Sequence, residues 1–354
     1  MVDTLNISTT KTQHSRLSEV DFNNIPFGRV FSDHMFVADY DGKSWTNLQI
    51  LPYQPLQLSP ANSALHYGQS VFEGMKAYRN QGKDVLVFRP RANFERLNLS
   101  AQRMCIPELP EELFMAGLTE LLRLDRDWVP ANENTSLYVR PFIFATDDYL
   151  GIRPSDTYKF MIFTCPVGAY YSEPVRVKIE TRYSRAAAGG TGAAKAAGNY
   201  AASLLPAVKA HQQGYHQLLW TDAKSHQFIE ESGTMNVMFI IDGTLITAPT
   251  GDTILAGITR DSVLTLAREW GYKVEERKVA VQEVIDAAKE GRLQEAFGTG
   301  TAATIAQIKG IGHEDKDYEL PPVEGREFSN RVLRALDEIK TGKVTDKWGW
   351  IYKV

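Results

Sequence analysis

The chain has 354 residues, of which 43% are hydrophobic and 23% are charged, a composition typical of a globular protein long enough for two domains. Lysine and arginine number 39 against 43 aspartates and glutamates, so the formal net charge is −4. A nucleic-acid interface or an anionic-lipid surface needs a basic excess, which this balance lacks. We therefore expect a small-molecule ligand, no nucleic-acid partner and no membrane partner.

The two cysteines, Cys105 and Cys165, are too few for a disulfide framework or a zinc cluster. We therefore expect both cysteines to be reduced thiols, and we expect no metal site. The first twenty residues, MVDTLNISTTKTQHSRLSEV, include acidic residues and lack an apolar core, so they do not predict a signal peptide. No apolar run approaches the ~18 residues of a membrane helix. The expected location is the cytoplasm.

The first half of the chain begins with a polar, patternless stretch, residues 1–24, which predicts a loose arm. Apolar spacing and turn residues then predict a strand, a helix and two further strands, at 84–90, 93–104, 135–146 and 158–168. Pro174 marks a hinge before another strand. We place a linker at 168–181, between an N-terminal domain (1–167) and a C-terminal domain (182–354).

The second half has clearer signals. Asp242-Gly243 lies between two β-rich runs and predicts a hairpin over 236–249. Two amphipathic stretches, 260–270 and 281–291, are each ended by a glycine, as helices commonly are. HQLLWTD predicts a strand, and the segment 295–308 predicts a strand that breaks into a glycine turn. Hairpins among mixed strands and helices favour an α+β fold over a regular parallel βαβ fold.

Two glycine-rich motifs do not fit nucleotide-binding fingerprints. GTGTAA (298–303) has Ala303 where a dinucleotide fingerprint has its third glycine, and no acidic residue follows at suitable spacing. GGTGAAK (189–195) lacks the adjacent Gly-Lys and the following Ser or Thr of a phosphate loop. Two turns could still bind an anion through backbone N–H groups: the helix start at AGITRDSV (256–263) and the GTGTA turn (298–302). An ordinary helix start and a plain strand-end turn are the simpler alternatives.

Lys195 lies in GGTGAAKAAGNY (189–200), among glycines and alanines with no acidic neighbour. A free lysine has a pKa of about 10.4, and a crowded, desolvated lysine near positive charge loses its proton more readily and can attack an aldehyde. With two anion-binding turns, this pattern suggests pyridoxal phosphate. The cofactor's ring nitrogen needs a carboxylate partner. IEESGTMN offers Glu230 or Glu231, of which strand alternation turns one inward; two solvated loop acids are the alternative.

Over nearly its whole length the chain resembles the branched-chain amino acid aminotransferases of the fold-type IV pyridoxal-phosphate enzymes. The blocks that carry the resemblance are LHYGQSVFEGMKAY, VFRPRANFERLNLSAQRMCIP, SLYVRPFIFA, CPVGAYY, GGTGAAKAAGNYAAS, EESGTMNVMF, ILAGITRDSVLTLA and EAFGTGTAATIAQI. The resemblance implies an α+β fold with a smaller N-terminal α/β domain. It also implies a larger, cofactor-binding C-terminal domain with a barrel-like β core.

The resemblance also implies roles around the cofactor. Lys195 would be the catalytic lysine that forms the Schiff base, Glu231 the partner of the pyridine nitrogen and Tyr200 the partner of the phenolic oxygen. The phosphate would be bound by Arg89, Ile258, Thr259 and Thr301. Arg185 matches a position near the cofactor, with a role that the resemblance leaves open.

On the substrate side, the resemblance implies an apolar pocket, because burying one aliphatic side chain contributes roughly 1.5–3 kcal/mol. The implied lining residues are Phe27, Tyr67, Phe72, Tyr138 and Thr234. Arg140, with Tyr138, would bind the second carboxylate of glutamate, and the backbone N–H groups of Thr301 and Ala302 would bind the α-carboxylate. Leu150 and Ile152 would close over the partner's site in a homodimer. Without the resemblance, the aromatic residues would be core residues and Arg140 a surface ion-pair residue.

The implied activity is reversible transfer of the amino group between leucine, isoleucine or valine and 2-oxoglutarate, in branched-chain amino acid biosynthesis or catabolism. It would follow a ping-pong mechanism. Two alternatives stay open: a D-amino acid aminotransferase or aminodeoxychorismate lyase of the same fold type, and a catalytically inactive binding relative. Ala303 and Ala306 stand where some animal members have Cys-x-x-Cys, so no thiol redox switch is expected.

Overall fold

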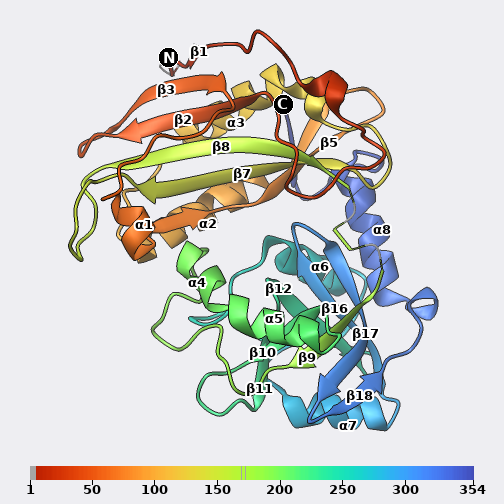
Figure 1. Cartoon of the computed structure of the whole chain (residues 1–354). Coiled ribbons are helices and arrows are strands. Elements are labelled where there is room, and N and C mark those ends of the chain that lie inside the picture. The colour runs from red at the N-terminus through yellow and green to blue at the C-terminus, as the bar shows by residue number, and fades with distance from the viewer. Residues whose placement is uncertain (1–4, 169, 172) are drawn as a thin grey trace. The chain divides into compact units, whose positions relative to one another are not determined.

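The computed structural model describes residues 5–168, 170–171 and 173–354, and the chain divides into two compact units (Figure 1). The first unit contains the chain up to Tyr170, together with 194–197 and 338–354. The second contains Tyr171–Ala193 and Gly198–Asp337. Because the last residues return to the first unit, that unit holds more of the chain than the second, whereas the N-terminal domain was expected to be the smaller. The predicted linker, 168–181, includes residues 169 and 172, which lie outside the described part.

The first unit is built on a nine-stranded sheet in the order β1-β3-β2-β8-β7-β5-β6-β19, with β4 paired to β7. Neighbouring strands are antiparallel, except for the parallel pair β1 and β3. The strands are β1 (Ser8–Thr9), β2 (His34–Tyr40), β3 (Trp45–Pro52), β4 (Ser70–Phe72), β5 (Met75–Arg79), β6 (Val85–Phe88), β7 (Ser136–Ala145), β8 (Tyr158–Val167) and β19 (Ile351–Lys353).

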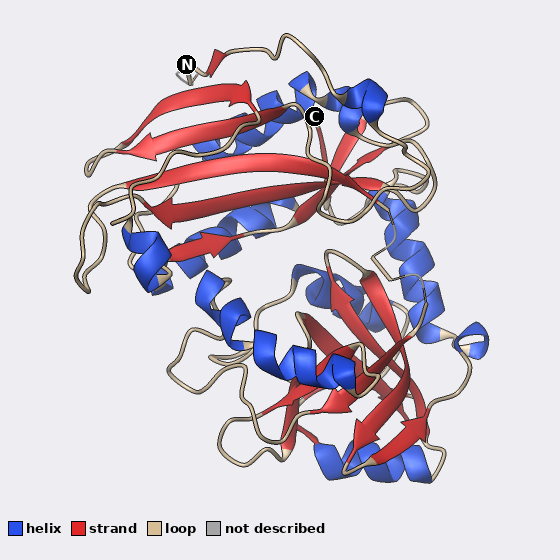
Figure 2. Cartoon of the chain, viewed as in Figure 1, coloured by secondary structure: helices blue, strands red, loops and turns tan. Residues whose placement is uncertain are grey.

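Alternation along the strands separates the two faces of this sheet. In β2, Phe36 belongs to the main core, whereas its neighbours Met35 and Val37 join a separate cluster. The main core is closed by the apolar faces of α2 (Pro90–Arg103) and α3 (Glu111–Leu124), which pack along the sheet (Figure 2). The unit also contains α1 (Ser63–Tyr67) and two 3₁₀ turns, Leu17–Glu19 and Arg126–Trp128.

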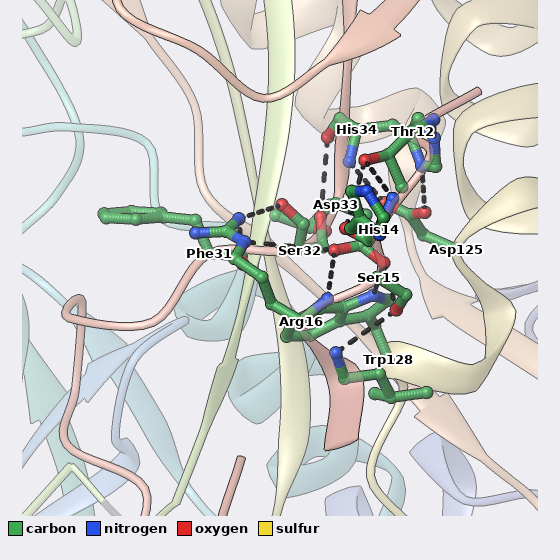
Figure 3. A network of polar contacts seen from close by, with 12 residues as sticks. Thr12, His14, Ser15, Arg16, Phe31, Ser32, Asp33, His34, Asp125 and Trp128 are labelled. Carbon is green, nitrogen blue, oxygen red and sulfur yellow. Dashed lines mark hydrogen bonds and ion pairs between the residues drawn. The ribbon is translucent and has the colours of Figure 1, made fainter. Parts of the chain in front are cut away.

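The prediction of a loose N-terminal arm is wrong for the described residues of that stretch; residues 1–4 lie outside the described part. The arm is bound to the start of β2, as Figure 3 shows. The Thr12 N–H donates to His34 Nε2 at 2.9 Å, and Ser15 Oγ donates to Asp33 Oδ2 at 2.5 Å. His34 Nδ1 in turn lies 2.6 Å from Asp125 Oδ1. The arm looked patternless because its polar groups find their partners on other segments of the chain.

The second unit contains a closed ring of strands. The order β12-β16-β17-β9-β10-β11 returns to β12, because β11 also pairs with β12, and β13, β14, β15 and β18 extend it. The strands are β9 (Val175–Ile179), β10 (Gln217–Thr221), β11 (Phe228–Ser232), β12 (Met235–Ile241), β13 (Thr244–Thr247), β14 (Val274–Glu276), β15 (Val279–Ala280), β16 (Leu293–Gly300), β17 (Thr304–His313) and β18 (Lys316–Glu319). This ring confirms the expected barrel-like β core and the α+β fold.

Alternate residues of the ring form its core. Val175, Val177 and Ile179 of β9 share one apolar cluster with Val237 and Phe239 of β12. The helices of the second half are α4 (Ala197–Ala202), α5 (Leu204–Gln212), α6 (Ile258–Glu269), α7 (Val281–Lys289) and α8 (Phe328–Lys340), with a 3₁₀ turn at Val323–Gly325. Among the described residues, no helix combines the length and apolarity needed to cross a bilayer.

The predicted hairpin and helix ends are confirmed. Asp242 and Gly243 have φ of 50° and 71°, the left-handed pair that a two-residue turn between β12 and β13 requires. Gly271 and Gly291 follow α6 and α7 with φ of 78° and 71°, which a side chain would oppose. Both cysteines are free, as expected; Cys165 is buried and Cys105 is exposed.

Candidate functional site

Lys195 belongs to the first unit and is held there through its backbone. Its N–H donates to Ser100 Oγ of α2 at 2.9 Å, and its carbonyl accepts from the Phe72 N–H of β4 at 3.0 Å. Its ammonium nitrogen lies 4.9 Å from the centroid of the Phe72 ring. The backbone anchors fix the base of a flexible side chain, so the amine has a defined region in which to act.

Phe72 connects this lysine to three other residues predicted for the substrate side. The Arg140 guanidinium lies 4.7 Å from the centroid of the Phe72 ring and donates to the Tyr138 hydroxyl at 3.3 Å. The Phe27 ring meets the Tyr138 ring edge-on, with centroids 5.7 Å apart. The first unit therefore brings together Lys195 and these four residues in one continuous group, which we call the Phe72 cluster.

Arg89 is the residue before α2, and its backbone has a φ of 50°, uncommon for a residue with a side chain. Its N–H donates to the Trp350 carbonyl at 2.6 Å, and its guanidinium lies 5.3 Å from the centroid of the Trp350 ring. The last segment of the chain therefore determines how Arg89 is held.

Three other predicted residues of the first unit lie on its surface. Tyr67, the last residue of α1, is 42% exposed, and Leu150 and Ile152 are 66% and 95% exposed. No contact joins them to the Phe72 cluster among the interactions described above. Single apolar side chains at a surface are common, so this exposure by itself does not mark a binding surface.

Glu231 is the centre of a polar cluster in the second unit, where it is 3% exposed. Its Oε1 accepts from the Leu255 N–H at 3.0 Å and from Asn236 Nδ2 at 3.2 Å. Its Oε2 lies 2.7 Å from Arg185 Nε; the N–H is not aligned with the oxygen, so this contact is an ion pair rather than a directed hydrogen bond. Arg185 is itself fixed through Nη2 by the carbonyls of Gly192 and Thr253, at 3.1 and 2.6 Å.

Glu230, the other candidate, has different surroundings. It is half-buried, and its Oε1 accepts from Thr253 Oγ1 at 2.6 Å. Burial raises the pKa of Glu230, and the hydrogen bond from Thr253 only partly opposes that shift. Of the two adjacent acids, Glu231 is the one that is buried and paired with a cation, as the alternation in β11 allows.

Two backbone turns of the second unit match the predicted anion-binding positions. α6 begins at Ile258 and Thr259 after Gly257, where a Cβ would collide with Asn236 Oδ1, so only glycine allows this close approach. Thr301 and Ala302 lie in the turn between β16 and β17. The register pairs Asn236 of β12 with both Glu231 and Thr299, so the buried carboxylate and the start of this turn lie on the two strands that flank β12.

The remaining predicted residues of the second unit, Tyr200 and Thr234, lie outside the hydrogen-bonded cluster around Glu231 that is described above. Tyr200 is partly buried in α4, and Thr234 is exposed in the turn between β11 and β12. The predicted residues thus fall into a lysine–aromatic cluster in the first unit and a carboxylate cluster with two turns in the second.

Several residues that hold the predicted ones in place were not themselves predicted, among them Ser100, Asn236 and Trp350. Asn236 could have been found, because a hairpin around Gly233 places it opposite Glu231. Ser100 contacts Lys195 from about 95 residues away in the sequence, and Trp350 contacts Arg89 from about 260 residues away. No local sequence pattern indicates contacts between segments so far apart.

The donor set fits pyridoxal phosphate. A lysine amine can react with the aldehyde, and an ion pair with arginine favours the ionised form of a carboxylate, the form that a protonated ring nitrogen needs. Arg89 and the start of α6 offer a guanidinium and a helix N-terminus, both of which suit a phosphate.

Known proteins are similar to this chain over most of its length. The family model described as amino-transferase class IV matches residues 70–311. A branched-chain-amino-acid aminotransferase 2 of Bacillus subtilis (strain 168) is 46% identical over 355 residues, which cover 99% of this chain and 97% of the relative.

Two solved structures have the same fold. The branched-chain amino acid aminotransferase of Escherichia coli has a TM-score of 0.73 at 29% identity, covering 90% of this chain and 98% of that chain. A branched-chain amino acid aminotransferase from T.th., complexed with N-(5'-phosphopyridoxyl)-L-glutamate, has a TM-score of 0.74 at 26% identity, covering 92% and 99%. The chain therefore belongs to the class IV aminotransferases, and within them to the family of branched-chain-amino-acid aminotransferases.

Proposed function

We propose that the protein uses pyridoxal phosphate to transfer the amino group of leucine, isoleucine or valine to 2-oxoglutarate, reversibly and by a ping-pong mechanism. The observation that carries this proposal is Lys195, anchored through its backbone beside Phe72, Tyr138 and Arg140, in a chain of this family. The names of the relatives indicate branched-chain amino acids as the first substrates. The positive charge of Arg140 favours a second substrate that has two carboxylates.

The cofactor supplies an aldehyde that takes up the amino group and a ring that withdraws electrons from the substrate's α-carbon. The Lys195 amine would hold the cofactor covalently through its aldehyde carbon. Glu231 would pair with the ring nitrogen of the cofactor, and Arg185 would hold the Glu231 carboxylate in place. Tyr200 would donate to its phenolic oxygen. Its phosphate would be bound by Arg89, Ile258, Thr259 and Thr301.

Lys195 would also move the proton that amino transfer requires. In its neutral form the amine takes the proton from the substrate's α-carbon, and it later returns a proton, so it acts first as general base and then as general acid. The backbone bonds to Ser100 and Phe72 limit where the amine can reach. A restricted reach keeps the Lys195 amine near the α-carbon of the substrate, from which it takes the proton.

The substrate side chain would lie against Phe27, Tyr67, Phe72, Tyr138 and Thr234. An apolar wall alone would reject glutamate, because an unpaired buried charge is costly. Arg140, which already donates to the Tyr138 hydroxyl, would pair with the second carboxylate. The N–H groups of Thr301 and Ala302 would bind the α-carboxylate.

We propose a homodimer in the cytoplasm, in which Leu150 and Ile152 of one subunit close over the site of the other. The support is their exposure, 66% and 95%, in the loop that also carries Tyr149, which is 46% exposed. A contact with a second copy would remove this apolar surface from water.

Substituting Lys195 tests the function. Lys195→Ala is expected to lower kcat for L-leucine with 2-oxoglutarate by at least about 10²–10⁴-fold, the usual contribution of a positioned acid–base group. The measurement is 2-oxo acid formation, with borohydride reduction followed by peptide mapping to locate the bound cofactor. Lys224→Ala, at an exposed lysine, is the control and should keep full activity. A reduced cofactor on a peptide without Lys195 would refute the proposal.

The two alternatives that the sequence left open predict different substrates. Parallel assays with L-leucine, D-alanine and aminodeoxychorismate separate an L-branched-chain enzyme from its fold-type relatives, and activity with none of them would favour a binding protein.

A further inference from the structure

Asn236, in β12, is a buried polar residue whose side chain connects two parts of the second unit. Its Nδ2 donates to Glu231 Oε1 at 3.2 Å and to the Leu255 carbonyl at 2.9 Å. Leu255 also donates its own N–H to Glu231 Oε1 at 3.0 Å. A side-chain amide has two N–H donors, so these two acceptors account for both donors of Asn236. The three residues therefore form a closed triangle of hydrogen bonds.

The oxygen of the same amide lies against the start of α6. A Cβ at Gly257 would collide with Asn236 Oδ1, so the amide occupies the space that a side chain there would need. The backbone of Gly257 does not itself require glycine, because its φ of −71° is open to other residues. The contact with Asn236, rather than backbone strain, therefore favours glycine directly before Ile258, the first residue of α6.

The segment that leads into α6 is held by the same group of side chains. Arg185, whose Nε lies 2.7 Å from Glu231 Oε2, donates through Nη2 to the Thr253 carbonyl at 2.6 Å. Two residues later, the N–H and the carbonyl of Leu255 are bound by Glu231 and Asn236, respectively. The buried carboxylate and the approach to α6 therefore share one set of contacts, and Asn236 touches both.

The proposed cofactor would benefit from such a connection. Its ring nitrogen and its phosphate are joined by covalent bonds, so the groups that bind them must lie at a matching separation. A site whose parts are already fixed at that separation binds more tightly, because binding does not have to order them. We propose that Asn236 is a positioning residue for the cofactor, which fixes the Glu231 carboxylate relative to the N–H groups of Ile258 and Thr259. The inference rests on the cofactor roles proposed above for these three residues.

The experiment measures binding to the cofactor-free protein with three probes that lack an aldehyde and so cannot react with Lys195. Pyridoxamine phosphate carries both groups, pyridoxamine lacks the phosphate, and inorganic phosphate lacks the ring. Equilibrium dialysis gives the Kd of the first two, and competition against pyridoxamine phosphate gives that of the third.

In Asn236→Ala, pyridoxamine phosphate is expected to lose about tenfold in affinity, the size of effect that follows loss of a hydrogen bond to a charged group. Pyridoxamine and inorganic phosphate should each lose less than about threefold, because one part of the site can shift to bind a single group. A loss for either of these two probes as large as that for pyridoxamine phosphate would overturn the proposal, because Asn236 would then serve one part of the site alone.

Asn330→Ala is the matched control. Asn330 is half-buried in α8 of the same unit, and its Nδ2 donates to the Val323 carbonyl at 2.7 Å, so this variant also loses an amide–carbonyl hydrogen bond. Its Kd for pyridoxamine phosphate should stay within about threefold of the wild-type value. A tenfold loss in this variant as well would overturn the proposal, since the effect would not be specific to Asn236.

Gly257→Ala tests the contact between Asn236 and α6 independently. In the wild-type background the added methyl group would collide with Asn236 Oδ1, so affinity for pyridoxamine phosphate should fall. In the Asn236→Ala background the methyl group has room, and the same change should have little effect. Such non-additivity is typical of residues in direct contact. Equal effects in the two backgrounds would overturn the proposal.

Near-ultraviolet circular dichroism shows whether each variant is folded. If Asn236→Ala is not folded, Gly257→Ala decides alone: it should weaken pyridoxamine phosphate more than pyridoxamine, and equal losses would overturn the proposal. Failure of the proposed function gives a different result. A wild-type protein that bound no pyridoxamine phosphate would refute the cofactor assignment and this inference with it, whereas equally tight binding in the wild type and in Asn236→Ala would refute the positioning role alone.

Discussion

Two adjacent glutamates show how much one strand position changes the chemistry of a carboxylate. Glu231 is buried beside Arg185, Asn236 and the Leu255 N–H, whereas Glu230 is half-buried with a hydrogen bond from Thr253. The pKa of Glu230 is raised by burial, so this acid holds its negative charge less readily. Only Glu231 combines burial with a cation partner and lies one strand from the β16–β17 turn.

This difference predicts unequal effects of the same substitution. Glu231→Gln is expected to lower kcat for L-leucine by about 10- to 100-fold, the equivalent of one charge-assisted hydrogen bond of roughly 1.5–3 kcal/mol. Steady-state kinetics and the absorbance of the bound cofactor report the change. Glu230→Gln is the matched control and should change kcat less than threefold. Equal losses in the two variants would contradict the assignment of Glu231.

Among the structural elements, the turn between β10 and β11 depends on a single carboxylate. Asp222 accepts from the N–H groups of Ser225, Gln227 and Phe228, at 2.8, 2.9 and 2.9 Å. Burial alone would raise its pKa, but the N–H groups of Phe228 and Ser225 outweigh burial and lower the pKa of Asp222 from 3.8 to about 2. The ionised form therefore stabilises the fold.

The sign of this shift gives a pH dependence. A carboxyl group whose pKa is depressed by folding contributes its full stability above its unfolded value, and that contribution is lost as the pH falls from about 4 to about 2. Asp222→Asn should therefore unfold at lower urea concentration at pH 7 and lose less stability over that acidic range. Urea titrations at several pH values measure both effects. Asp315→Asn, at an exposed turn, should match the wild type; a steep acidic loss retained in Asp222→Asn would contradict the prediction.

At the scale of the whole molecule, the residues predicted for one site divide between the two units, and some predicted residues lie exposed. In the homodimer proposed above, Leu150 and Ile152 would act only through a second chain that they cover. The Ile152 side chain is 95% exposed, so the fold of its own subunit places almost no constraint on it.

Ile152→Asp is therefore expected to leave the melting temperature of the dissociated subunit unchanged while it weakens self-association at least tenfold. It should also raise the KM for L-leucine, because a wall of the pocket would come from the other chain. Sedimentation velocity over a concentration series measures the first effect and kinetics the second. Val344→Asp, at another exposed apolar residue, is the control. Wild-type association in Ile152→Asp would count against the closing loop.

The elements that the sequence predicted best are those whose signals are local. The hairpin at Asp242-Gly243 and the two glycine-terminated helices were each recognisable within a dozen residues. The arm was mispredicted because Thr12 and Ser15 bind His34 and Asp33, which follow about twenty residues later. The helix α3 was not predicted, although its leucines are buried at helical spacing.

The site could be predicted only in part for the same reason. The resemblance supplied Glu231, but not the Asn236 and Leu255 contacts that hold it. Asn236 stood inside a recognised block without an assigned role, because Leu255 and Gly257, which its side chain contacts, lie about twenty residues later. Pairing between distant segments is set by tertiary packing, which no single stretch of sequence encodes.

The pairing of β19 with β6 has a consequence for the order in which the protein matures. Arg89 is held by the carbonyl and ring of Trp350, a residue synthesised about 260 positions later. Domains generally fold as units while the ribosome is still elongating the chain, but this first unit cannot complete its sheet until residues 351–353 have been synthesised. Until Trp350 is in place, Arg89 lacks the carbonyl and the ring that hold it, so the position before α2 is among the last of the first unit to become ordered.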